Sequence, residues 1–171
     1  DADKQVSILV EFQARLEAAK ASVAQLPGIV MSLGGAIGFE REAHGQAAGL
    51  RTNILVSVGA CLMMMLSLEM EEIHRHLAVD QSVVRLDPAR IASYAIASMG
   101  FLGAGAIITG KGTVRGLTTA AGLWLVTGIG LAVGAGYLIP ALFAALVSLV
   151  MALGISFTVG VVGFVSPSLH R

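Results

Sequence analysis

The sequence has little charge and almost no cysteine. Only 13% of its 171 residues are charged, and 11 basic residues balance 11 acidic ones at a net charge of zero. Soluble domains hold about 25% charged residues, and nucleic-acid binding needs a basic excess, so the composition speaks against both classes. The single cysteine, Cys61, lies in an apolar run and cannot form an internal disulfide, so neither redox nor zinc chemistry is indicated. What the chain has is apolar surface, with 56% hydrophobic residues and a mean hydropathy of +0.82, which predicts a membrane protein.

Five apolar runs have about the length that a helix needs to cross a bilayer core of about 30 Å. They cover residues 23–39, 50–68, 91–109, 117–135 and 139–165, and every charged residue except Arg51 lies outside them. We therefore predict an all-α membrane protein with about five transmembrane helices in a compact Gly-rich bundle. The fifth run is longer than needed, so it is expected to tilt or to be only partly embedded.

Residues 1–22 are predicted to form an amphipathic helix at the membrane interface. Its apolar residues recur every three or four positions and are Leu9, Phe12, Leu16, Ala19 and Val23. A partner-binding or coiled-coil helix is the alternative, and Pro27 is expected to kink the entry to the first span. The predicted organisation is this helix, a transmembrane domain over 23–165 and a short tail over 166–171, with no soluble C-terminal domain.

Glycines recur about every four residues within the runs, as in Gly34, Gly38 and Gly130, Gly134, a spacing that favours close helix packing in lipid. The alternative is that some of them unwind a helix and line a polar cavity. At a fixed offset of 67 residues, one set of five residues reappears in a second set. The sets are Gly38, Gly45, Gly49, Leu50, Thr52 and Gly105, Gly112, Gly116, Leu117, Thr119. This echo suggests two parallel helical hairpins, although five matches in a Gly-rich stretch leave a true repeat open.

The few polar residues at helix ends are the candidate functional residues. Arg51, near the start of the second run, is predicted to anchor at the interface and to pair with Glu40 or Glu42; a ligand or proton pathway is the alternative. Asp87 before Pro88 is typical of a helix N-cap.

Two features of the fourth run complete this set. Thr118 and Thr119 start the run and can bond backbone carbonyls or line a polar path, and Trp124 lies deeper, where helix packing competes with an interfacial role.

No arrangement of residues typical of catalysis is visible: there is no Ser/His/Asp or Cys/His set, phosphate loop or CxxC pattern. We therefore expect a protein that is not an enzyme and has no cofactor. The segment 69–90 is rich in carboxylates and contains His74 and His76, but no loop signature organises them as metal ligands. A solvated loop is favoured over a metal site.

Five blocks of this sequence, in order and spacing, resemble the MgtC/SapB family over roughly residues 26–136. They are 34–42 (GGAIGFERE), 48–52 (AGLRT), 87–92 (DPARIA), 100–105 (GFLGAG) and 114–121 (VRGLTTAA), the last followed by Trp124. Members of that family are bacterial inner-membrane proteins of about five spans, linked to growth in low magnesium and to virulence. Some are reported to act on the F-type ATP synthase, so the resemblance implies a stress or virulence factor that regulates another membrane complex.

The resemblance also implies which residues form the functional motif and where this chain departs from it. The motif residues carried over by position are Glu40, Arg41, Arg51, Thr52, Asp87, Arg90, Arg115, Thr118, Thr119 and Trp124. The family often has Gln where Tyr94 stands and Gly where Ser98 stands, and many of its members have a soluble C-terminal domain.

Basic residues do not decide the orientation of the spans, but the acidic residues divide two against nine between the two sides. Together with the family resemblance, this favours a cytoplasmic C-terminus. On that side we expect Glu40, Arg41, Arg51 and Arg115 to form a partner contact or a gated polar pocket. The alternative function is a small Mg²⁺ or H⁺ channel or secondary transporter, and a homo-oligomer is plausible for so small a bundle.

Overall fold

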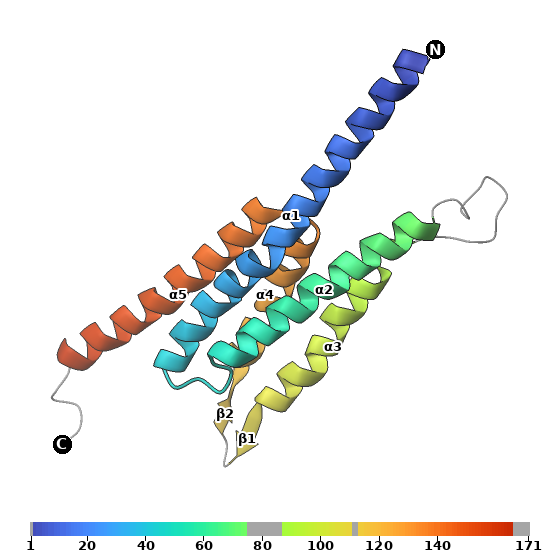
Figure 1. Cartoon of the computed structure of the whole chain (residues 1–171). Coiled ribbons are helices and arrows are strands. Elements are labelled where there is room, and N and C mark those ends of the chain that lie inside the picture. The colour runs from blue at the N-terminus through green and yellow to red at the C-terminus, as the bar shows by residue number, and fades with distance from the viewer. Residues whose placement is uncertain (1, 75–86, 111–112, 166–171) are drawn as a thin grey trace.

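A computed structural model describes residues 2–74, 87–110 and 113–165, and almost all of this backbone is helical (Figure 1). The elements in chain order are α1 (Ala2–Ala43), α2 (Leu50–His74), α3 (Arg90–Ala106), β1 (Ile108–Gly110), β2 (Thr113–Arg115), α4 (Leu117–Gly134) and α5 (Leu138–Val165). The prediction of an all-α chain is confirmed, apart from the small β-hairpin. The predicted tail, residues 166–171, lies outside the described residues.

Four of the predicted runs begin within one residue of a helix, although the third run continues to residue 109 whereas α3 ends at Ala106. The fourth run differs by one residue from α4, and the second continues past residue 68 into the acidic end of α2. By length and composition, two helices of the described part could cross a bilayer, over 50–73 and 117–134, while 138–154 is a shorter apolar segment.

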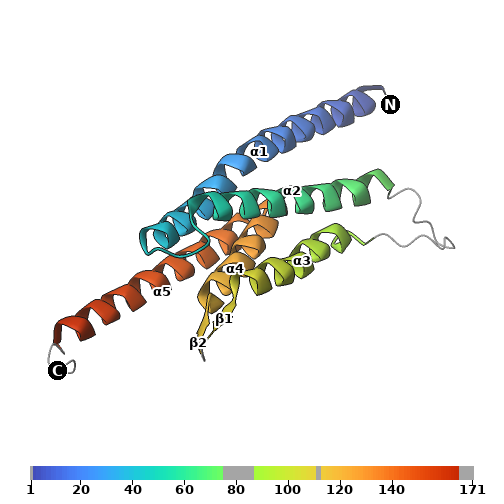
Figure 2. The same cartoon turned by 90° about the horizontal axis from the view of Figure 1, so that it is seen from below.

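Helix α1 joins two segments that the sequence separates. It runs without a break from Ala2 to Ala43, so residues 1–22 and the first span share one helix, with Pro27 inside it. A proline within a helix removes one backbone hydrogen bond, but the rest of the ladder carries the helix past it. The N-terminal part of α1 extends past the corner between α4 and α5 (Figures 1 and 2). The predicted amphipathic face of this part lies outside the side chains that the structure describes.

Helix α2 lies between α1 and α4, and glycines bring the backbones close on both sides. On α1, a Cβ added at Gly38 would lie 2.7 Å from Leu50 Cα. On α4, a Cβ added at Gly134 would lie 2.9 Å from Met64 Cβ. Real Cβ atoms do not approach so closely, so each glycine fits where a side chain would not. In lipid, where apolar burial drives little association, such close backbone contact is a main source of helix packing.

A two-stranded antiparallel hairpin links α3 to α4, and the sequence did not predict it. Strand β1 pairs with β2 so that Ile108 lies opposite Arg115 and Gly110 opposite Thr113. Gly116 then turns the chain into α4 with φ of +88°, and an added Cβ there would collide with the Ala106 carbonyl oxygen. Only glycine adopts this conformation without strain.

The two proposed hairpin repeats are therefore joined differently. The first connection is a short loop over 44–49, whereas the second is the β-hairpin. The paired glycines also differ, because Gly38 touches α2 while a Cβ at Gly105 would meet nothing within 4 Å.

Candidate functional site at the ends of helices α1, α2 and α4

Three helix ends meet at one end of the molecule, and most of the candidate residues lie there. These are the C-terminus of α1, the N-terminus of α2 and the N-terminus of α4, which follows the β-hairpin (Figure 1). The alternation of helix direction along the chain brings them together. Glu40, Arg41, Arg51, Thr52, Arg115, Thr118 and Thr119 belong to these ends.

Glu40 and Arg41, in the last turn of α1, form a partly buried ionic cluster with His44. The Arg41 Nε lies 3.4 Å from Glu40 Oε2, and His44 Nδ1 lies 3.0 Å from Glu40 Oε1. The Arg41 side chain is only 15% exposed and the Glu40 side chain 12%, so both have lost most of their hydration. The Arg41 Nε atom is buried, and despite the nearby carboxylate it makes no hydrogen bond. A buried cation without full hydrogen bonding is costly, so Arg41 depends on the neighbouring Glu40 carboxylate for compensation.

The loop after α1 is fixed to both neighbouring helices by side-chain hydrogen bonds. The Leu50 N–H donates to Glu42 Oε2 over 2.8 Å, which caps the start of α2. Asn53 is buried and its Nδ2 donates to the carbonyls of Ala48 and Gly49, at 2.9 and 2.8 Å.

The same loop reaches α4 through buried Thr119, whose hydroxyl donates to Gln46 Oε1 over 3.3 Å. The predicted role of the Thr119 hydroxyl in backbone bonding is thus replaced by a side-chain contact that joins the first hairpin to the second. Thr118, its neighbour, is exposed.

The predicted pairing of Arg51 with Glu40 or Glu42 is wrong. Arg51 is exposed, Glu40 is engaged by Arg41 and His44, and Glu42 binds backbone. The reason is helix rotation: the buried face of α2 is occupied by Asn53, which turns Arg51 outward. Thr52 is exposed as well, and so is Arg115 on β2.

Asp87 and Arg90 lie at the other end of the molecule, at the start of α3, so they do not join this cluster. Asp87 is not the N-cap that the sequence predicts, because the cap position is Ala89, which has no side-chain cap. The Asp87 Oδ1 instead accepts the Ala89 N–H over 3.0 Å in a turn that Pro88 shapes, and Arg90 Nε lies 3.8 Å from Asp87 Oδ2. Trp124 is 59% exposed on the outside of α4, so it does not pack between helices.

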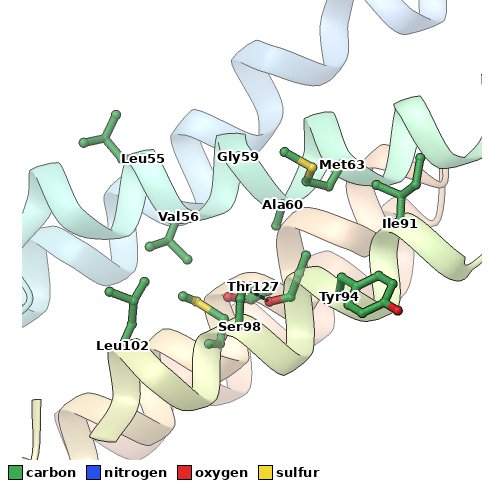
Figure 3. Close-up of a pocket in the computed structure, with 12 residues that line it drawn as sticks. Leu55, Val56, Gly59, Ala60, Met63, Ile91, Tyr94, Ser98, Leu102 and Thr127 are labelled. Atoms are coloured by element: carbon green, nitrogen blue, oxygen red, sulfur yellow. Dashed lines mark hydrogen bonds between the residues drawn. The ribbon is translucent and has the colours of Figure 1, made fainter. Parts of the chain in front are cut away.

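A groove opens between α2 and α3, with α4 at its base (Figure 3). Its volume is about 500 Å³. Most of its walls are apolar. Two of its hydroxyls are bonded to their own helices: Ser98 donates to the Ala95 carbonyl and Thr127 to the Leu123 carbonyl, each over 2.9 Å. Tyr94 and Ser98, the two departures from the family pattern, both line it. We refer to this space as the α2–α3 groove.

Among the described residues, no three His, Cys, Asp or Glu side chains come close enough to hold a metal ion. Glu69, Glu71 and Glu72 line a separate cavity at the far end of α2. His76 and Asp80 of the acidic segment lie outside the described residues.

The side chains are distributed differently from those of a soluble domain, because the interior holds polar as well as apolar residues and large apolar residues cover the outside. Polar residues are buried between the helices: Asn53, Ser57, Ser67, Thr119 and Thr127. Large apolar residues are exposed along the outer faces, as on α5, where Ile139, Phe143 and Met151 are each more than half exposed. Such a continuous apolar exterior is far larger than water tolerates, so the fold is that of a helical membrane protein.

Residues 28–160 match the MgtC family profile, and the chain belongs to this family. Curated relatives are alike over about half of the chain. The protein named "Putative magnesium transporter YhiD" of Escherichia coli K12 is 42% identical over 84 residues, which cover 49% of this chain and 37% of that protein. Protein MgtC of Brucella abortus (strain 2308) is 42% identical over 87 residues, 50% of this chain and 31% of the relative. Protein MgtC of Salmonella typhimurium 14028s is 40% identical over 87 residues, which cover 51% of this chain and 32% of the relative.

The chain thus matches about a third of the length of these relatives. No solved structure is similar to it.

Sequence reasoning missed the buried polar residues of α2. Asn53, Ser57 and Ser67 are almost fully buried, and the Ser57 hydroxyl donates to the Ile54 carbonyl over 2.9 Å and to Val30 of α1 over 3.4 Å. The spacings of four and ten residues place all three on one helix face. That small polar stripe within an apolar run was the signal that could have identified the interior face.

Proposed function

We propose that this chain is a multi-pass protein of the bacterial inner membrane that supports growth in low magnesium, as a stress or virulence factor. It acts by docking against another membrane complex, for which the F-type ATP synthase is the candidate that the family suggests. The five spans are residues 23–39 of α1 with α2, α3, α4 and α5, packed as a compact Gly-rich bundle. Five spans put the two ends of the chain on opposite sides of the membrane, and the division of the acidic residues together with the family resemblance favours a cytoplasmic C-terminus.

The observation that carries docking is the α2–α3 groove. It is open, apolar, and bordered by small residues that let a helix approach closely: Gly59, Ala60, Ala95 and Ser98 (Figure 3). A Cβ added at Gly59 would meet nothing within 4 Å, so this glycine serves no contact inside the chain. Helix association in lipid uses such small residues, and a partner's transmembrane helix has the matching shape and chemistry.

Magnesium transport is the second candidate, supported by the name of the E. coli relative. A transport route needs polar groups that replace the hydration shell of the ion. In the described groove the Ser98 and Thr127 hydroxyls are already bonded to their own helices, which favours docking over transport.

Site-specific photo-crosslinking in membranes tests docking. A crosslinking amino acid at Ser98, on the groove wall, is expected to capture a subunit of another membrane complex. The control position is Ala97, exposed on α3 outside the groove. Equal capture from both positions, or capture only of a second copy of the chain, would contradict docking of a partner in the groove.

A growth assay and a flux assay separate the two functions. Ala95→Trp fills the groove and is expected to abolish support of growth in low magnesium, whereas Ile96→Trp, outside the groove, is expected to keep it. Proteoliposomes of the unchanged chain are expected to pass no more Mg²⁺ than empty vesicles. Robust flux that Ala95→Trp blocks would establish the transporter instead.

A further inference from the structure

A second cavity lies between α4, α5 and the end of α1. Its volume is about 500 Å³, within the range of about 300–1,000 Å³ typical of small-molecule sites. One end holds Arg41 and Thr118, and the rest is lined by apolar residues of α4 and α5, among them Leu125, Val147 and Met151. We call it the α4–α5 cavity.

The α4–α5 cavity is separate from the α2–α3 groove. Successive helical residues are about 100° apart, which places Thr127, at the base of the groove, opposite Thr118 on α4. Thr118, Gly122 and Leu125 share the face that lines the cavity. The inference below therefore requires the membrane placement of the proposed function but not its partner docking.

The charged end of the cavity has an unsatisfied donor. Arg41 Nε is buried without a hydrogen bond, and a Cβ added at Gly122 would lie in ordinary van der Waals contact with it at 3.9 Å, so the Arg41 side chain lies against α4. The Thr118 hydroxyl makes no hydrogen bond within the described part of the chain. Glu40 is the nearest carboxylate, and its charge is also shared with His44. Among the described side chains at this end, three arginines (41, 51 and 115) exceed two glutamates (40 and 42), which favours an anion.

The apolar end opens outward. Phe143, Val147 and Met151 follow one another at intervals of four residues along α5 and remain exposed while lining the cavity. Arg41 lies in the last turn of its helix, the depth at which arginine reaches the headgroup region. The cavity thus combines a cation at headgroup depth with an apolar channel that leads toward the bilayer interior.

We propose that the α4–α5 cavity binds one anionic phospholipid. The lipid phosphate accepts hydrogen bonds from the Arg41 guanidinium and the Thr118 hydroxyl, and one acyl chain lies between α4 and α5. Such a lipid would place its phosphate against the Arg41 side chain that lines the cavity and cover the apolar walls at once.

Lipid retention measured by native mass spectrometry tests the proposal. The full chain is purified from nanodiscs of equal parts phosphatidylglycerol and phosphatidylethanolamine, and the lipid that remains bound is identified. We expect one phosphatidylglycerol per chain. Arg41→Gln removes the charge, and Val147→Trp fills the cavity; each is expected to weaken retention roughly tenfold or more. The matched controls are Arg51→Gln, at the same end but exposed, and Leu146→Trp, exposed on α5 outside the cavity; both should retain the lipid.

Three results would overturn the proposal. Equal retention of both lipids would show that charge plays no part, and full retention by Arg41→Gln would place the lipid elsewhere. If inorganic phosphate alone binds and Val147→Trp does not weaken it, the site holds a free anion rather than a lipid. A parallel thermal melt of each variant separates loss of lipid from loss of fold. A variant that melts early is replaced by Arg41→Met, which also removes the charge, or by Val147→Phe, for which the same reduction in retention is required.

Discussion

The close contact between α2 and α4 makes a quantitative prediction at Gly130. A Cβ placed on this residue of α4 would lie 2.8 Å from Ala60 Cβ and 3.0 Å from the Ser57 carbonyl carbon, and it would collide with the Ser57 carbonyl oxygen. These neighbours are helix backbone and a methyl group, neither of which can rotate away. Gly130→Ala must therefore push α2 and α4 apart along their shared length.

The size of the effect follows from two opposing contributions. Alanine favours a helix over glycine by about 1 kcal/mol, while forcing a methyl group into a packed core costs about 1–3 kcal/mol. Gly128→Ala is the matched control, because its Cβ would meet nothing within 4 Å and it gains the same helix propensity. The difference between the two variants isolates the packing cost, so Gly130→Ala should be about 1–3 kcal/mol less stable than Gly128→Ala.

The single cysteine offers the assay. Cys61 is buried at the same α2–α4 contact, where its backbone faces Gly134. A maleimide reaches it only when the helices separate, so the labelling rate in detergent follows the open population. The expected cost corresponds to labelling about 5 to 150 times faster in Gly130→Ala than in Gly128→Ala. Equal rates in the two variants would refute the close α2–α4 contact.

Three further substitutions test the first hairpin and its link to α3, each read as thermal stability in detergent. Gly38→Ala should destabilise the α1–α2 contact by about 1–3 kcal/mol, whereas Gly35→Ala, whose Cβ would find only ordinary side-chain contacts, should not. Asn53→Ala leaves the buried Ala48 carbonyl without its side-chain donor, whereas the Gly49 carbonyl keeps the Asn53 backbone N–H, and it should cost about 1–3 kcal/mol; exposed Thr52→Ala should cost little. Ser67→Ala removes the 2.6 Å bond from α2 to the turn before α3 and should cost about 0.5–1.5 kcal/mol; no loss would mean that this turn is held otherwise.

The fold could be predicted from the sequence where hydropathy and charge agree. The fourth apolar run matches α4 to within one residue because Arg115–Gly116 stops it on one side and a glycine pair on the other. The β-hairpin could not be predicted, because strands of three residues that include Thr109 and Thr113 carry no periodicity.

The sequence predicts at which end of the bundle the candidate site lies, but it does not predict which side chains contact each other there. Alternating helices put the end of α1 and the start of α4 at the same end of the bundle, so topology predicts that Arg41 and Thr118 lie at one end, while packing makes them neighbours. Which side chain faces inward depends on helix rotation, and rotation follows packing. The sequence therefore favoured Arg51 as the partner of Glu40, although Asn53 occupies the inner face of α2 and Arg51 points outward.

The two proposed binding sites share helix α4 but lie on its opposite faces, which bears on whether they influence each other. A ligand in one site changes the other only if α4 moves between two arrangements. The glycine contacts at Gly130 and Gly134 oppose such movement, because α4 cannot slide past α2 without bringing side chains into their place. The lipid and the partner are therefore expected to bind independently in the unchanged chain. Gly130→Ala, by loosening that contact, is the substitution that would allow one site to sense the other.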